Sequence, residues 1–256
     1  MFIDELVLTI IFSANVTMQY ALFRQSGALA QRYGAVLLGD PFRMLLFLCQ
    51  VAFIVGVLLL TQHYASIPSH TLMFWLPLAV FWCGGFAACQ EIVRERAIFR
   101  REQMIGVTIP AYLLSKYRLL SIVVFLQTAL LILILSAEFP FSDHLFFWWL
   151  FAYLFALVGV AFGLLVSAVT PNRLTALLAT GSFAIAHVAF FYYAIAPGMP
   201  FSMLKYTPVG MGYLISHALM AAEPEMFTLF AGIGILCLWG GICGMLTMLL
   251  LRRANS

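Results

Sequence analysis

The chain has 256 residues, of which 64% are hydrophobic and 9% are charged, and its formal net charge is +3. A soluble globular domain carries about 25% charged residues, so this chain has too few polar side chains to cover a core of its size in water. These values exclude an ordinary soluble protein, and the small net charge gives a nucleic-acid partner no electrostatic support. The solvent for most of the chain is therefore lipid.

The N-terminal segment, residues 1–43, comes before the first long apolar run. Its own apolar stretch, near residues 6–14, is about half the length that a spanning helix needs and is followed by polar residues. We therefore expect this segment to form an interfacial or cytoplasmic helix rather than a span.

Six later segments are apolar over about the 20 residues that a spanning helix needs. They are, in chain order, residues 44–61, 72–88, 119–136, 145–169, 174–196 and 227–251. The sequence thus predicts an all-α membrane protein with six transmembrane helices. Its spanning domain covers residues 44–251, and a short tail, residues 252–256, follows.

Lysine and arginine fall almost entirely on one side of these predicted spans. Of the 13 cations, only Lys205 lies on the other side. The positive-inside rule therefore places both termini in the cytoplasm. The outer loop between the fifth and sixth spans, residues 197–226, holds several prolines and an apolar stretch, which predicts a short re-entrant or interfacial helix.

Charge is concentrated between the second and third predicted spans, in the segment QEIVRERAIFRREQ at residues 90–103. Its pattern predicts an amphipathic helix along the membrane surface, with the charges toward the cytoplasm. Pairs within the helix do not explain the charge, because attraction between Glu91 and Arg94 is offset by repulsion between Arg96 and Arg100. A topology anchor explains the arginines but not the interleaved glutamates, whereas a contact surface for a soluble partner explains both.

The stretch GGFAACQEIVRERAIFRREQMIGVTIPAYLLSKYRLLSIVVFLQT, which begins at Gly84, closely resembles the membrane domain of type-2 ABC exporters. The resemblance is to the G-subfamily (White-type) branch and its bacterial relatives. It is carried by Glu-Ile-Val at residues 91–93, by the Glu-Arg-x-Ile-Phe-x-Arg-Glu pattern over residues 95–102, and by Ala-Tyr-Leu-Leu-Ser-Lys at residues 111–116. Weaker similarity extends it over most of residues 37–219.

This resemblance implies a permease subunit that forms a translocation path as a dimer with a second copy. The charged segment would be the coupling helix that docks on an ATP-binding subunit, and residues 19–43 would be the amphipathic connecting helix. The residues expected at the coupling interface are Glu91, Arg94, Glu95, Arg96, Phe99, Arg101 and Glu102, with Arg96 and Glu102 as the main carriers. The substrate cavity is expected at one face of the fifth span, which carries Phe183, His187, Phe190 and Phe191. A lipid-facing stripe is the alternative for that face.

In some members of the family the ATPase is fused to the membrane domain on one chain. This sequence has no G-x-x-x-x-G-K-[ST] motif, the phosphate-binding loop of such an ATPase. The resemblance therefore implies a chain that is not itself an enzyme and binds no cofactor. ATP and Mg²⁺ would belong to a separate ATPase subunit. Animal members of the family have cysteines in the long outer loop, whereas this loop has none, so the resemblance favours a bacterial inner membrane. No metal site is expected.

An alternative function is that of a non-transporting assembly or scaffold subunit. Such a subunit would recruit a soluble partner through the basic loop, residues 90–106. The substrate also stays open among lipid, glycolipid, polysaccharide and hydrophobic drug.

Two pairs of glycines, Gly159 with Gly163 and Gly240 with Gly244, are each four residues apart. Both pairs predict close helix packing.

Overall fold

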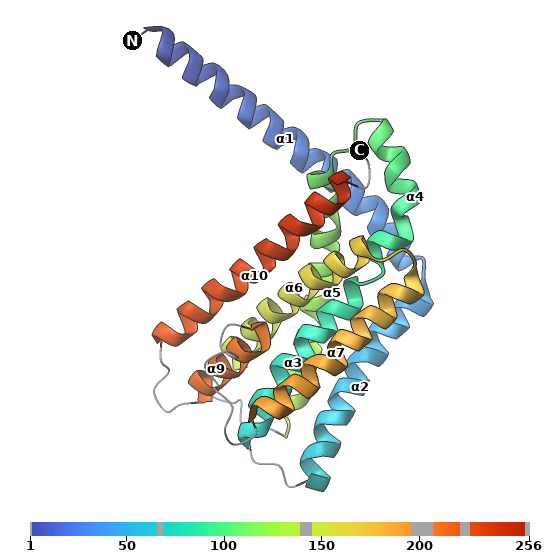
Figure 1. Ribbon diagram of the computed structural model, residues 1–256, viewed down its shortest axis with the longest axis vertical. Helices are drawn as coiled ribbons and strands as arrows, with labels where there is room; N and C mark the ends of the chain where they lie inside the picture. Colours follow the sequence, from blue (N-terminus) through green and yellow to red (C-terminus); the bar gives the residue numbers. More distant parts are fainter. Residues whose placement is uncertain (1, 66–68, 139–144, 196–206, 221–225, 254–256) are drawn as a thin grey trace.

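The computed structural model describes residues 2–65, 69–138, 145–195, 207–220 and 226–253. All regular elements within these ranges are α-helices, which confirms the predicted all-α class (Figure 1). They are α1 (Phe2–Leu38), α2 (Pro41–Ala65), α3 (Ser69–Ala88), α4 (Glu91–Met104), α5 (Ile109–Leu135), α6 (Leu145–Val169), α7 (Arg173–Ile195), α9 (Pro208–Met220) and α10 (Met226–Arg253).

Five stretches within the described residues are long and apolar enough to cross a membrane, which makes the chain a multi-pass membrane protein. They lie on α2, on α3 continued into α4, on α5, on α6 and on α10. In α7 the side chains are described only as far as Ala189, and the apolar stretch within that part, Arg173–Ala189, is shorter than the candidate spans. The fifth predicted span, residues 174–196, therefore stays a prediction.

Helices α3 and α6 form the centre of the bundle. Helix α6 contacts α3, α5, α7, α9 and α10, and 67% of its most apolar stretch is buried, against 17% for α2 and for α10. Glycine allows the close contact between α3 and α6. A Cβ atom on Gly84 would lie 2.0 Å from the carbonyl oxygen of Ala156, and one on Gly159 would lie 2.0 Å from that of Phe81. The backbones thus touch directly, as predicted for the pair Gly159 and Gly163.

The second small-residue pair behaves differently. A Cβ atom on Gly240 or Gly244 of α10 would meet nothing within 4 Å. Both glycines instead border a space between α5, α6 and α10. Within the chain no neighbouring helix packs closely on this pair, because a spacing of four residues sets only the face of a helix and not whether a neighbour approaches it.

The long loop before α10 contains a short helix, as predicted. Helix α9 packs on α3 and α10 at the end of the bundle opposite α4 (Figure 1). Its buried face includes Met211 and Ile215. Its placement as a re-entrant segment stays a prediction, and Lys205 lies outside the described residues.

Helix α1 leaves the bundle at its N-terminal end, while its C-terminal part lies against α5 and α2 (Figure 1). Tyr33 and Leu37 anchor that part, with 3% of each residue exposed. The predicted connecting segment, residues 19–43, thus forms the second half of α1 and the first turn of α2.

Candidate coupling site

Helix α4 lies at the same end of the bundle as the α1–α2 corner and the C-terminal end of α10 (Figure 1). A turn at Cys89 and Gln90 separates it from α3. Its C-terminal end is set by Gly106, whose φ of 97° is readily adopted only by glycine. The amide of Gly106 donates to the carbonyl of Gln103, and that of Val107 to the carbonyl of Glu102, both at 3.0 Å. These bonds complete the last turn of the charged segment.

Helices α4 and α6 cap each other. The hydroxyl oxygen of Ser167, near the end of α6, accepts from the amides of Ile92 and Val93 at 3.0 Å each, and these are among the free N–H groups of the first α4 turn. In return, Arg96 donates to the carbonyls of Ser167, Ala168 and Thr170 at 3.2, 3.1 and 2.8 Å. A cation at the carbonyl end of a helix also complements its dipole. The charged helix is therefore joined to the centre of the bundle.

The three glutamates of α4 pair with cations on other helices. Glu91 pairs with Arg43 of α2, Glu95 with Lys116 of α5, and Glu102 with Arg32 of α1. All three glutamates are buried, with at most 9% of each residue exposed. Burying a charge is costly unless it is paired, so the three ion pairs fix the positions of α1, α2 and α5 against α4.

Lys116 is the most enclosed of these cations, with 1% of its side chain exposed. Its Nζ atom lies 2.6 Å from Oε2 of Glu95, 3.6 Å from Oε2 of Glu91, and 3.0 Å from the ring centroid of Tyr33. The ring supplies a cation–π contact on top of the two carboxylates. Lys116 therefore connects α5 to α4 and α1 through one charged group.

A fourth ion pair lies near the rim of this cluster. Arg94 donates to Oδ2 of Asp40, between α1 and α2, at 3.1 Å. This hydrogen bond, together with the one from the backbone amide of Arg43, holds the pKa of the Asp40 carboxyl below its usual value. The contact extends the charged network to the α1–α2 corner.

These contacts differ from the expected orientation of the charged segment. The sequence predicted that its charges would face the cytoplasm, but Glu91, Glu95 and Glu102 are buried toward the other helices. Phe99 is buried as well and stacks on Tyr112 of α5 with ring centroids 3.9 Å apart. The physical reason is that α1, α2 and α5 each bring a cation to this face. Arg94 and Arg96 are also paired within the chain, so of the expected interface residues only Arg101 is exposed.

The outward face of α4 carries Arg101, which the sequence predicted at the interface, together with Arg100 and apolar residues that sequence reasoning did not select. Arg100 and Arg101 are exposed and have no ion partner in the described part of the chain. Beside them Ile98, Met104 and Ile105 are 48%, 80% and 83% exposed. Ile98 and Ile105 are seven residues apart, which is about two helical turns, and this spacing within a charged segment was a signal for such a face. The combination of two cations with three apolar side chains can bind an acidic partner surface that also has apolar contacts.

A cavity of about 300 Å³ brings together two of the residues expected at the substrate site. Phe183 and His187 of α7 line it with aromatic side chains of α3, α6 and α10. The His187 ring packs edge-on against Phe81 and Trp82, with centroids 6.0 and 5.9 Å away. His187 thus faces its own chain, whereas Phe183 is 55% exposed. The side chains of Phe190 and Phe191 lie outside the described residues.

Comparison with protein families agrees with this architecture. Residues 24–209 match the family described as ABC-2 type transporter, which is more than half of the chain. The chain belongs to the ABC-2 type transporter family. A search of curated proteins finds no match for it. Membrane domains of the ABC-2 family are permeases that lack an ATPase site and work with an ATP-binding subunit, so this chain is the membrane part of an ABC transporter.

Proposed function

We propose that this ABC-2 chain is an exporter permease that works as a homodimer and is driven by a separate ATP-binding subunit. It would lie in a bacterial inner membrane with both termini in the cytoplasm. The observation that carries the proposal is the division of α4 into two faces. Ion pairs and caps hold the inward face to α1, α2, α5 and α6, while Arg100 and Arg101 on the outward face have no partner in the described residues.

This division supports a transmission role for α4. A subunit that binds the outward face pushes on a helix whose inward face is already joined to several spans. Motion of the partner on ATP binding therefore reaches α6 and α5 without passing through a flexible loop. Substrate export would follow from movement of these spans, with Phe183 and His187 at the passage together with Phe190 and Phe191.

The partner's chemistry follows from the exposed side chains. Arg100 and Arg101 require carboxylates, and Ile98, Met104 and Ile105 require an apolar groove. Glu91, Glu95, Arg96 and Glu102 act indirectly in this proposal, because they hold α4 in place. Arg101 is the residue common to this surface and to the interface expected from the sequence.

The experiment is copurification of the tagged chain with its ATP-binding subunit, comparing Arg101→Glu with Arg252→Glu. Both substitutions reverse one exposed arginine at the same end of the bundle, but Arg252 lies on α10. Losing one partner of a buried interface pair costs about 2–5 kcal/mol, so Arg101→Glu should weaken association tens- to thousands-fold. Arg252→Glu should retain equal numbers of the two subunits and normal ATP turnover.

Two results would contradict the proposal. The first is normal subunit ratio, ATP turnover and transport in both Arg101→Glu and Arg100→Glu. The second is copurification of a soluble protein without ATPase activity, which would favour the scaffold alternative.

A further inference from the structure

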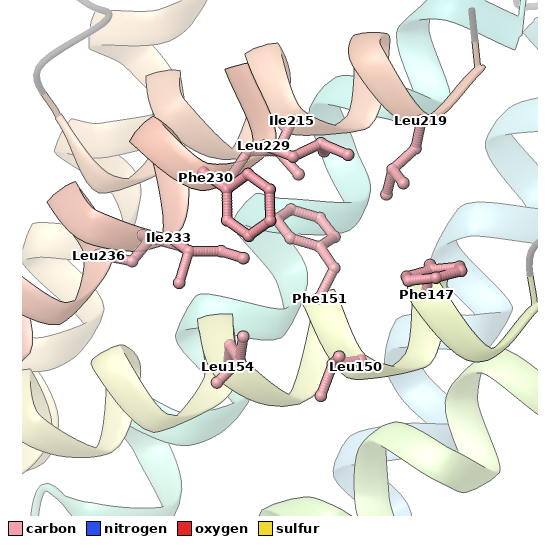
Figure 2. A pocket seen from close by; sticks show the side chains of 10 residues that line it. All are labelled: Phe147, Leu150, Phe151, Leu154, Ile215, Leu219, Leu229, Phe230, Ile233 and Leu236. Atoms are coloured by element: carbon pink, nitrogen blue, oxygen red, sulfur yellow. The ribbon is translucent and has the colours of Figure 1, made fainter. Parts of the chain in front are cut away.

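Two apolar cavities follow the line where α6 and α10 meet. The first has a volume of about 280 Å³ and lies between α6, α9 and α10. Its walls consist of Phe, Leu and Ile side chains only (Figure 2). Phe151 of α6 and Phe230 of α10 approach each other across it, and Ile215 and Leu219 of α9 close a third side (Figure 2). The first cavity therefore offers a ligand no hydrogen bond and no charge.

The second cavity has a volume of about 300 Å³ and continues the first along α10. The two share Leu154, Ile233 and Leu236 as lining residues. The second is open because Gly240 and Gly244 place no side chain in it. Together the cavities form one groove, which we call the α6–α10 groove.

The length and width of the α6–α10 groove restrict its occupant. It follows α10 from Leu229 to Gly244, which corresponds to about 22 Å at 1.5 Å per residue. One leaflet of the hydrocarbon core is about 15 Å thick, half of the bilayer's 30 Å. The groove is therefore long enough for a whole lipid tail. A second helix, about 10–12 Å across, is too wide for spaces of this volume.

The surroundings identify the source of that tail. Both α6 and α10 are candidate spans, so the groove lies at the depth of the hydrocarbon core. Its rim is open, because Phe147 and Phe230 are 53% and 68% exposed. An empty apolar cavity loses dispersion contacts on all its walls, and a hydrocarbon chain restores them. The third wall from α9 distinguishes the groove from a flat lipid-facing surface.

We infer that the α6–α10 groove is a binding site for a single hydrocarbon tail of a membrane phospholipid. The tail lies along α10, with its first part between Phe151, Ile215 and Phe230 and its second part beside Gly240. This site shares Val158 with the α7 cavity that contains His187 but lies on the other side of it, toward α5 and α9, and it does not depend on the proposed coupling role of α4.

The test is photolabelling of the full chain in phosphatidylcholine vesicles that contain a trace of phosphatidylcholine with a diazirine in the middle of one tail. Adducts are then mapped by peptide mass spectrometry. We expect them to concentrate near Leu154 and Ile233, above the yield at Leu126 and Leu133, which are exposed on α5 outside the groove.

A matched pair of variants tests occupancy. Gly240→Leu adds a side chain at the second cavity, where a Cβ atom meets nothing within 4 Å, and Gly56→Leu adds the same side chain at an equally open position on α2. Gly240→Leu should lower adduct yield in the groove roughly tenfold, the effect of losing about two buried methylenes. Gly56→Leu should leave it unchanged. Leu154→Trp should act like Gly240→Leu from the opposite wall.

Several outcomes would overturn the inference. Equal labelling of the groove and of Leu126 and Leu133 would show ordinary lipid contact only. An unchanged yield in Gly240→Leu and Leu154→Trp would place the bound tail elsewhere. Labelling by a diazirine fatty acid but not by the phospholipid would show that the groove binds a free fatty acid instead of a phospholipid tail. A disulfide between two copies through Cys237 would show that a second copy covers the groove.

Discussion

Arg96 and Ser167 each cap the helix on which the other residue lies. The Ser167 hydroxyl satisfies amides at the start of α4, while the Arg96 guanidinium satisfies carbonyls at the end of α6. Each helix end has orphan backbone groups, and here the two ends satisfy one another. The charged segment is thus part of the folded bundle as well as a candidate surface for a partner.

The first prediction concerns this junction. Ser167→Ala leaves the amides of Ile92 and Val93 without their acceptor and should cost about 1 kcal/mol, the usual effect of losing a cap. The thermal unfolding midpoint of the detergent-solubilised chain measures this loss of stability. Ser121→Ala is the control, because the Ser121 hydroxyl bonds only to the carbonyl of Arg118 in its own helix. Equal midpoints for both variants would contradict the capping role.

Because Arg96 is part of this junction, its substitution cannot by itself test contact with a partner subunit. Arg96→Glu would place a carboxylate beside the carbonyls of Ser167 and Thr170, so it should lower the thermal midpoint before any partner is added. Loss of transport in this variant therefore does not identify a partner contact. Charge reversal at Arg101 does, because Arg101 is exposed.

A second prediction concerns the buried lysine. Lys116→Met removes the partner of Glu95 and leaves a buried carboxylate unpaired, which should cost about 3–5 kcal/mol. Adding Glu95→Gln should restore part of the stability, because the unpaired charge is then removed. The unfolding midpoints of both variants and of Glu95→Gln alone form a double-mutant cycle. Additive effects would show that the two side chains are not coupled.

A third prediction concerns the contact between α3 and α6. Gly84→Ala places a Cβ atom 2.0 Å from the carbonyl oxygen of Ala156, so the helices must separate, and overpacking of this kind costs about 1–3 kcal/mol or more. Gly56→Ala on α2 meets nothing within 4 Å and should be neutral or slightly stabilising. Thermal midpoints measured in parallel check both. If Gly84→Ala is as stable as Gly56→Ala, the helices do not approach as closely as described.

A fourth prediction concerns orientation. In a background without the five native cysteines, a cysteine at Ser142 should react with an impermeant thiol reagent from outside the cell. A cysteine at Gln103 should react only after permeabilisation, because the cation distribution predicts that α4 lies on the cytoplasmic side. Labelling of intact cells at Gln103 would reverse the topology and contradict the position proposed for the ATP-binding subunit.

A fifth prediction concerns the α7 cavity. Phe183→Ala and His187→Ala should each change the stimulation of ATP turnover by substrate, because both side chains line the same cavity. Subunit ratio in the purified complex should stay normal in both variants. Leu178→Ala, at a side chain of α7 that is 61% exposed, is the control. Unchanged stimulation in Phe183→Ala and His187→Ala would show that this cavity is not on the substrate path.

The apolar runs were sufficient to predict the class of fold, because a helix in lipid must satisfy its own backbone and be about 20 residues long. The charge clustering was also sufficient to locate the unusual segment. The partners of its glutamates were not predictable, because Arg43, Lys116 and Arg32 come together only when α2, α5 and α1 are in place. Tertiary pairing of this kind leaves no periodic pattern in the sequence.

The glycines show the same limit in another form. The pairs at Gly159 and Gly240 have identical spacing, yet the first is covered by α3 and the second faces a cavity. Spacing along one helix gives the face on which residues lie, whereas contact depends on the path of the neighbouring helix. The spacing of the glycines therefore predicted two candidate sites of close helix contact. Which of them is a contact depends on the arrangement of the helices.

The backbone contact between α3 and α6 also determines which parts of the bundle can rearrange. No side chains stand between Gly84 and Gly159 that could adopt other rotamers, so moving α3 against α6 would require the two backbones to separate. Helix α4 is attached to the C-terminal end of α6 through hydrogen bonds of Ser167 and Arg96. We therefore expect the helix movements of a transport cycle at the contacts of α10 and α7, which border cavities.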